Sequence, residues 1–175
     1  MTTLIIGSNG SGKSLYAENL AAGYASSALY YIATMVPYGE EGRIRVEKHR
    51  KQRRSKGFIT IEEPFSVSTV TIPPDTVVLL EDVSNLLGNT LFDGSGTGNE
   101  DSVFMDIAAM LAKCATAVIV SIDGLAVSRE YGGETIAYIE ALNRLNNRLR
   151  DFADTVVLMD KGKPIFIKGG ADALD

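Results

Sequence analysis

Residues 7–14 read Gly7-Ser8-Asn9-Gly10-Ser11-Gly12-Lys13-Ser14. They fit the phosphate-binding loop pattern G-x-x-x-x-G-K-[ST] at every fixed position. The apolar run at 3–6 before this loop predicts a buried strand, and residues 15–22 after it favour a helix. The pattern requires this order of strand, loop and helix, so the alternative of a Gly/Ser-rich turn without a ligand is disfavoured.

The loop has the chemistry that a bound phosphate needs. Glycines at 7, 10 and 12 let backbone N–H groups approach closely, and the start of the helix adds partial positive charge. Lys13 is expected to reach the β- and γ-phosphates, while the Ser14 hydroxyl coordinates Mg²⁺. The sequence therefore predicts ATP or GTP binding by residues 7–14, with Lys13 as a catalytic residue.

The composition is that of one globular domain, which we expect to span residues 1–175. Hydrophobic residues make up 45% of the chain and charged residues 22%, and no apolar run approaches the ~20 residues of a membrane span. The amino terminus lacks the basic lead and the long apolar run of a secretory signal. Cys114 is the only cysteine, which excludes an intramolecular disulfide, and we interpret it as a packing residue. We expect a cytoplasmic protein.

Strands and helices alternate along the chain. Strand patterns occupy residues 3–6, 28–33, 58–62, 76–80, 116–122, 155–159 and 165–167. Helical patterns occupy residues 15–22, 103–112 and 134–150, with another helix-prone stretch from residue 83, and the Gly-rich stretch within 91–102 is interpreted as a surface loop. This order predicts an α/β, P-loop NTPase-like fold, with a mainly parallel sheet flanked by helices and a C-terminal antiparallel hairpin.

Two acidic residues, Glu81 and Asp82, close the apolar strand at 76–80. A carboxylate in this position downstream of a phosphate-binding loop is the Walker B arrangement, which holds Mg²⁺ directly or through water. The alternative for Asp82 is an N-terminal helix cap, because a helix-prone stretch follows it. Both interpretations hold if each residue takes one role. Ser14, Glu81 and Asp82 are the candidate metal ligands.

The charge is concentrated in one segment. The chain carries a net charge of −5, yet residues 43–56 contain eight basic residues and one acid, Glu47. The segment is therefore +7 and the remainder −12. Such asymmetry indicates an anionic partner at one place rather than a surface that coats nucleic acid.

His49, the only histidine, lies within this basic segment. If residues 40–54 form a helix, Arg45, His49 and Arg53 share one face. The neighbouring guanidiniums disfavour the imidazolium, so the ring stays nucleophilic, and they match phosphate oxygens. His49 is then a candidate nucleophile for the α-phosphorus of a nucleoside triphosphate. The alternative is a surface histidine on a solvated helix.

The segment Arg45-Val46-Glu47-Lys48-His49-Arg50-Lys51-Gln52-Arg53 resembles the bifunctional adenosylcobinamide kinase / adenosylcobinamide-phosphate guanylyltransferase family. The phosphate-binding loop and Tyr31-Ile32-Ala33-Thr34 precede it in the same order. The similarity continues through residues 79–89 and 146–149 to Ala153-Asp154 and so covers nearly the whole chain.

The resemblance implies two reactions: phosphorylation of the aminopropanol hydroxyl of adenosylcobinamide with ATP or GTP, and transfer of GMP from GTP to the product through a guanylylated histidine. His49 matches that histidine. The positions that match nucleotide-contacting residues are Ala33, Thr34, Met35, Lys51, Gln52, Arg53, Arg54, Glu62 and Glu81. Asp123 or Glu81 is available as a base or metal ligand. The family also implies a homo-oligomer, commonly a trimer.

Two other functions compete with this one. A P-loop kinase of another small metabolite would use the basic segment as a clamp and lid, which leaves His49 dispensable. A nucleotide-switched module would bind RNA or a protein partner through the same segment. The segment lacks interleaved aromatic residues and the chain is acidic overall, so no nucleic-acid partner is expected.

Overall fold

The computed structural model describes residues 1–24, 28–37, 39–40, 43–44, 46–47, 51, 56–92 and 98–170. The strands are β1 (Thr2–Gly7), β2 (Ala28–Ala33), β3 (Ile59–Glu62), β4 (Thr76–Glu81), β5 (Thr116–Ile122), β6 (Thr155–Asp160) and β7 (Lys163–Lys168). The helices are α1 (Lys13–Gly23), α3 (Val83–Phe92), α4 (Glu100–Leu111), α5 (Gly133–Phe152) and the short 3₁₀ helix η1 (Val67–Thr69).

The strands form one seven-stranded sheet in the order β3-β2-β4-β5-β1-β6-β7. Every neighbouring pair is parallel except β6 and β7, which form an antiparallel hairpin. This architecture confirms the predicted α/β class, the mainly parallel sheet and the C-terminal hairpin. The order adds a feature that the sequence pattern does not contain: β5 lies between β1 and β4.

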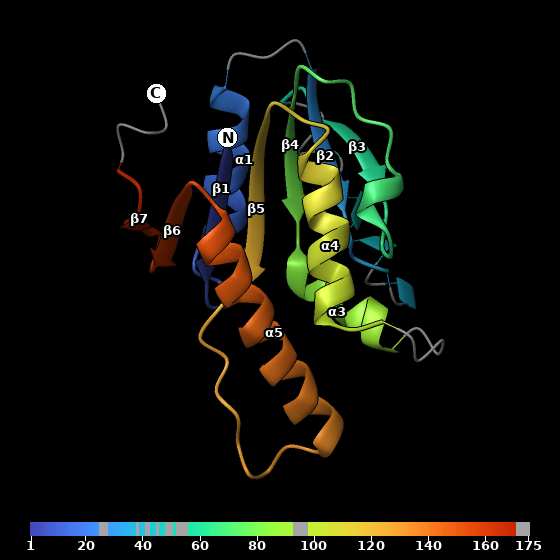
Figure 1. The fold of residues 1–175 in the computed structure, drawn as a ribbon, viewed down its shortest axis with the longest axis vertical. Helices are drawn as coiled ribbons and strands as arrows, with labels where there is room; N and C mark the ends of the chain where they lie inside the picture. Colours follow the sequence, from blue (N-terminus) through green and yellow to red (C-terminus); the bar gives the residue numbers. More distant parts are fainter. Residues whose placement is uncertain are drawn as a thin grey trace.

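Each face of the sheet has its own apolar core because successive residues of a strand point to opposite faces. Ile5, Leu79 and Val118 pack with α1 on one face. Leu4 and Leu80 belong to the other core, which α3, α4 and α5 complete. Figure 1 shows the sheet between these two layers of helices.

At the carboxyl edge of the parallel strands, one helix extends beyond the sheet. Figure 1 shows α5 extending well beyond the carboxyl ends of β4 and β5, connected to β5 by the long segment 123–132. In open α/β sheets ligands bind at this edge. Within the described residues, no helix is both long enough and apolar enough to cross a membrane.

Three local predictions have an outcome here. Of the stretch 40–54, for which a helix was predicted, residues 40, 43–44, 46–47 and 51 are helical, and its other positions lie outside the described residues. The surface loop predicted within 91–102 is wrong at both ends, because α3 continues to Phe92 and α4 begins at Glu100, and residues 93–97 lie outside the described residues. Cys114 packs against the core, as predicted, and burial raises the pKa of its thiol.

Candidate nucleotide-binding site

The phosphate-binding loop connects β1 to α1 at the carboxyl edge of the sheet. Gly12 caps α1 in the left-handed region, with φ of 89°, which favours glycine. A Cβ on Gly7 would lie 2.7 Å from the Met159 carbonyl oxygen and 2.7 Å from Ser11 Oγ. Both glycines are therefore required by the shape of the loop and by its close contact with β6.

Lys13 lies within this loop and is only 7% exposed. Its ammonium group donates a hydrogen bond of 3.0 Å to the Ser8 carbonyl oxygen. Burial lowers the pKa of Lys13, while the nearby charges of Asp82 and Glu81 act in the opposite direction. The loop thus holds a poorly solvated cation that an anionic phosphate would stabilise.

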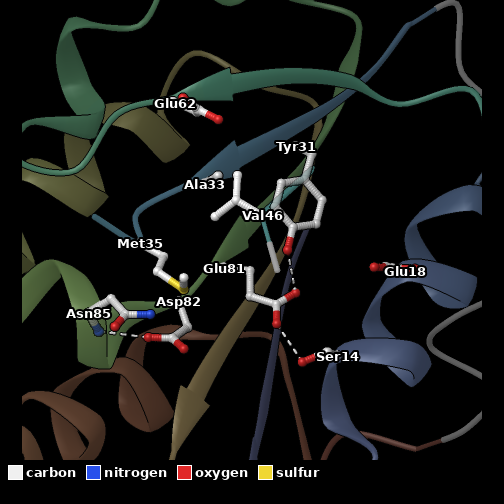
Figure 2. A pocket seen from close by; sticks show the side chains of 10 residues that line it. All are labelled: Ser14, Glu18, Tyr31, Ala33, Met35, Val46, Glu62, Glu81, Asp82 and Asn85. Atoms are coloured by element: carbon white, nitrogen blue, oxygen red, sulfur yellow. Dashed lines mark hydrogen bonds between the residues drawn. The ribbon is translucent and has the colours of Figure 1, made fainter. Parts of the chain in front are cut away.

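Glu81, at the end of β4, is the centre of the hydrogen bonding at the site. Ser14 Oγ donates to Glu81 Oε1, and the Tyr31 hydroxyl donates to Glu81 Oε2 at 2.7 Å. Figure 2 shows the carboxylate held between these two hydroxyls. Burial raises the pKa of Glu81, and the two hydrogen bonds oppose that shift. The arrangement joins the predicted Walker B carboxylate directly to the predicted magnesium ligand on α1.

These oxygens suit Mg²⁺, which prefers oxygen ligands and usually takes one or two from the protein, with phosphates and waters supplying the rest. The described residues contain no group of three or more His, Cys, Asp or Glu side chains placed to hold a metal alone. Ser14 and Glu81 fit a metal that arrives with a nucleotide. A cation would also compensate the buried charge of Glu81.

Replacing Glu81 with glutamine is expected to make the ligand-free protein more stable than the wild type, by a margin that grows as the pH rises. The carboxyl has an ordinary pKa of 4.5 in the unfolded chain and a raised pKa in the fold. Below pH 4.5 the Glu81 carboxyl is protonated in both the folded and the unfolded state. Above that pH the carboxyl ionises first in the unfolded chain. The folded state of the wild type therefore loses stability until the pH passes the folded pKa of Glu81. The Tm of the variant should exceed that of the wild type by about 2–4 °C at pH 8, the shift that ~1 kcal/mol produces in a chain of this size. Thermal unfolding between pH 5 and pH 8 measures the difference, and a gap independent of pH would contradict the expectation.

Asp82 has a different role from Glu81. Its Oδ1 accepts hydrogen bonds from the Asn85 backbone N–H at 2.7 Å and from the Ser84 hydroxyl at 2.5 Å. These contacts cap the start of α3, as one of the two sequence interpretations of Asp82 predicts. The carboxylate still faces the same cavity as Glu81.

A cavity of about 220 Å³ opens beside Glu81. It is lined by Ser14, Glu18, Tyr31, Ala33, Met35, Val46, Glu62, Glu81, Asp82 and Asn85. Six of these were predicted site residues: Ser14, Ala33, Met35, Glu62, Glu81 and Asp82. Figure 2 shows them converging from α1, the ends of β2, β3 and β4, and the start of α3.

Other predicted residues lie elsewhere. Thr34 is fully buried and does not line the cavity; its hydroxyl donates to the Asp82 carbonyl oxygen at 2.7 Å and accepts from the Asp82 N–H at 2.8 Å. Lys51 is exposed and is not part of the cavity lining. Ser8, Asn9 and Gly10 are exposed in the phosphate-binding loop. The predicted residues Arg45, His49, Gln52, Arg53 and Arg54 lie outside the described residues.

Tyr31 and Asn89 are site residues that sequence reasoning missed. Tyr31 belongs to an apolar strand pattern that indicates core, and Phe58 does pack edge-on against its ring at 5.7 Å between centroids. Asn89, on α3, donates from its side-chain amide to the Thr34 and Pro64 carbonyl oxygens, each at 2.8 Å. Asn89 therefore joins the segments that follow β2 and β3, which carry the rim of the cavity.

Changing Asn89 to aspartate is expected to destabilise this rim. The substitution keeps the shape but removes both donors, so two carbonyl oxygens lose their partner and face a carboxylate instead. We expect a loss of about 2 kcal/mol in the free energy of unfolding, measured with urea, together with a several-fold weaker nucleotide affinity. Asn143 is a matched control, because its amide makes one long hydrogen bond of 3.5 Å to the Leu125 carbonyl oxygen. Equal effects of Asn89→Asp and Asn143→Asp would show that the rim does not depend on Asn89.

The phosphate-binding loop lies at the carboxyl edge of a mainly parallel sheet, and Glu81 at the end of β4 lies beside it. These features define a P-loop nucleotide-binding protein. The model of the cobinamide kinase / cobinamide phosphate guanyltransferase family matches residues 3–167, and the chain belongs to this family. The bifunctional adenosylcobalamin biosynthesis protein CobU of Escherichia coli (strain K12) is 33% identical over an alignment of 126 residues, and the match covers 65% of this chain and 68% of that protein.

Solved structures of other proteins share the fold. The flagellar accessory protein FlaH from Methanocaldococcus jannaschii has a TM-score of 0.52 at 14% identity, covering 95% of this chain and 77% of that one. An ATPase from the type III secretion system of pathogenic bacteria has a TM-score of 0.56 at 12% identity, covering 99% of this chain and 60% of that one. At these identities the likeness concerns the fold alone.

Proposed function

We propose that this protein is a bifunctional enzyme of cobalamin biosynthesis. It phosphorylates adenosylcobinamide with ATP or GTP and then transfers GMP from GTP to adenosylcobinamide phosphate. The observation that carries the proposal is the contact between Ser14 on α1 and Glu81 on β4, at a cavity rimmed by residues of β2 and β3, in a chain that the family model matches over residues 3–167. The E. coli relative, a bifunctional adenosylcobalamin biosynthesis protein by name, supports it.

In the first reaction the acceptor hydroxyl oxygen attacks the γ-phosphorus. The bond between the γ-phosphorus and the oxygen that bridges it to the β-phosphate breaks, and the nucleoside diphosphate leaves. Lys13 exchanges the Ser8 carbonyl oxygen for the phosphates and neutralises their charge. Mg²⁺, when bound, adds positive charge at the same phosphates, and Ser14, Glu81 and Asp82 are the residues that would hold it.

The phosphate-binding loop supplies the remaining contacts through residues 7–14. Ser11 Oγ is buried and has no hydrogen-bond partner among the described residues. A buried hydroxyl usually has a partner, and a phosphate oxygen or a water that accompanies the nucleotide would provide one. This orphaned hydroxyl supports a ligand in the loop.

In the second reaction His49 is the proposed nucleophile. Its imidazole nitrogen attacks the α-phosphorus of GTP and pyrophosphate leaves, which gives a guanylylated histidine. The phosphate of adenosylcobinamide phosphate then attacks this phosphorus, and the bond to His49 breaks. Arg45, Lys51, Gln52, Arg53 and Arg54 are the proposed phosphate and nucleotide contacts of this step, together with Ala33, Thr34, Met35 and Glu62. Their support is the motif around His49 and the family membership.

Incubation with α-labelled GTP tests this function. A guanylylated histidine carries a phosphoramidate bond, so the wild type should retain label that is stable to alkali and lost in acid. Because the chain contains one histidine, a phosphohistidine label can only be at residue 49. Phosphorylation of adenosylcobinamide is followed in parallel with γ-labelled ATP and GTP. A wild type that phosphorylates the substrate but takes no α-label is a kinase without the transfer step.

We further propose that residues 1–175 act as one nucleotide-binding domain in the cytoplasm, and that the working form is a homo-oligomer, with a trimer as the expected state. The support is the family membership. Light scattering in solution measures the mass of the assembly against the 18.8 kDa of one chain. A mass of one chain at working concentrations would contradict the oligomer.

A further inference from the structure

The carboxyl end of β5 lies between the two halves of the nucleotide site. β5 separates β1, which leads into the phosphate-binding loop, from β4, which ends at Glu81. Val120 pairs with Glu81, and Ile122 pairs with Gly7. The next residue, Asp123, donates its backbone N–H to the Gly7 carbonyl oxygen at 3.0 Å. Asp123 is therefore placed at the edge where the γ-phosphate of a bound nucleotide is expected.

Helix α5 fixes this strand end through two of its side chains, Asn146 and Arg150. Asn146 is fully buried; its amide oxygen accepts from the Ser121 hydroxyl at 2.7 Å and its amide nitrogen donates to the Ile122 carbonyl oxygen at 2.8 Å. Arg150 Nη2 donates to Asp123 Oδ1 at 2.7 Å, and Arg150 Nη1 donates to Asn147 Oδ1 at 2.7 Å. The last residues of β5 are thus held by a helix that makes no contribution to the cavity lining.

The partners of Asp123 and Glu81 separate the roles that the sequence leaves open for these two carboxylates. Glu81 is bonded by two hydroxyls, which can turn their lone pairs toward a cation. Asp123 is bonded by a guanidinium, whose permanent charge would repel a metal ion at the same carboxylate. A neutral hydrogen-bond donor suits Asp123 better. Its side chain is 22% exposed, so such a donor can reach it from solvent.

We propose that Asp123 receives the proton of the acceptor hydroxyl during phosphoryl transfer, and that Arg150 is its positioning residue. The inference rests on the proposed kinase function and deepens it. The hydroxyl oxygen forms its bond to the γ-phosphorus as the bond to the leaving nucleoside diphosphate breaks, and the released proton passes to the Asp123 carboxylate and then to water.

Asp123→Asn tests the catalytic part of the proposal. We expect kcat for cobinamide phosphorylation to fall about 100-fold, the usual contribution of a general base, while the KM for ATP changes less than about threefold. Slow ATP hydrolysis without acceptor, in which water replaces the alcohol, should fall as well. Labelling of His49 by α-labelled GTP involves no acceptor hydroxyl and should persist. Parallel loss of labelling and phosphorylation would mean that Asp123 only maintains the fold, and would overturn the inference.

Arg150→Gln tests the positioning part. We expect a fall of about tenfold in the phosphorylation kcat, within the range of a misplaced general base, with the KM for ATP again nearly constant and partial recovery in Arg150→Lys. Arg144→Gln is the matched control, because Arg144 joins the same helix to Glu100 of α4 by an ion pair of 2.6 Å and does not contact β5. A lower Tm with an unchanged kcat in Arg150→Gln would reduce Arg150 to a structural role and overturn this part.

The failure of the inference and the failure of the proposed function give different results. If the wild type phosphorylates cobinamide and Asp123→Asn does so equally well, the inference is wrong and the proposed function stands. If the wild type hydrolyses ATP but phosphorylates no cobinamide, the proposed substrate is wrong, and the hydrolysis rate of Asp123→Asn still decides the role of Asp123. A wild type that does neither overturns both.

Discussion

Lys13→Ala is expected to lower both phosphorylation of adenosylcobinamide and guanylylation of His49 by at least about 100-fold, the usual effect of removing a preorganised charge from a reacting group. Both reactions need the triphosphate in the loop, and Lys13 is its buried cation. Phosphorylation is measured with γ-labelled ATP and guanylylation with α-labelled GTP. Because burial lowers the pKa of this lysine, its removal should not lower the Tm of the ligand-free protein.

Lys113→Ala is the control for this substitution. Lys113 follows α4 and donates to the carbonyl oxygen of Ser68 in η1, and neither residue lines the cavity. The Lys113→Ala substitution should leave the rates of phosphorylation and of guanylylation unchanged. Loss of one activity in Lys13→Ala with the other intact would mean that the two reactions use different triphosphate sites, which contradicts the shared site proposed for them.

His49→Ala is expected to remove all acid-labile label from the protein and all transfer of GMP, because the covalent carrier is lost. Phosphorylation of adenosylcobinamide should continue, since its proposed machinery consists of the phosphate-binding loop, Glu81 and Asp123. The two variants then give opposite patterns: His49→Ala keeps phosphorylation and loses the label, whereas Asp123→Asn keeps the label and loses phosphorylation.

His49→Asn provides a second test, because asparagine approximates the size and polarity of histidine without a nucleophilic ring nitrogen. It should behave as the alanine variant does. Continued GMP transfer in either variant would exclude the covalent histidine, since the chain contains no other. Loss of both activities together would instead indicate that the basic segment is needed for nucleotide binding.

The sequence predicts most elements of this fold because their patterns are local. β2 and β5 have the bounds that continuous apolar runs predicted, Ala28–Ala33 and Thr116–Ile122. The start of α4 was missed because its first turn is acidic and carries no apolar periodicity. Asn99 and Ser102 form a capping box there, and this pair was the signal available in the sequence.

The site is less predictable because its geometry depends on contacts that are distant in sequence. Ser14 and Glu81 follow from motifs, and the structure brings them into contact. The Tyr31 hydroxyl reaches Glu81 from a strand that resembles core, and no pattern distinguishes it from its neighbours. The position of Asp123 depends on the insertion of β5 between β1 and β4, which is a property of strand order rather than of any local run.

Strand β7 affects the tendency of the protein to aggregate at high concentration. It is the last strand of the sheet among the described residues, and Ile165 and Ile167 are exposed on it. An open apolar strand of this kind invites edge-to-edge aggregation between copies. Lysines at both of its ends and the missing N–H of Pro164 oppose that pairing, so substitutions that replace these three residues should cost yield during expression before they cost activity.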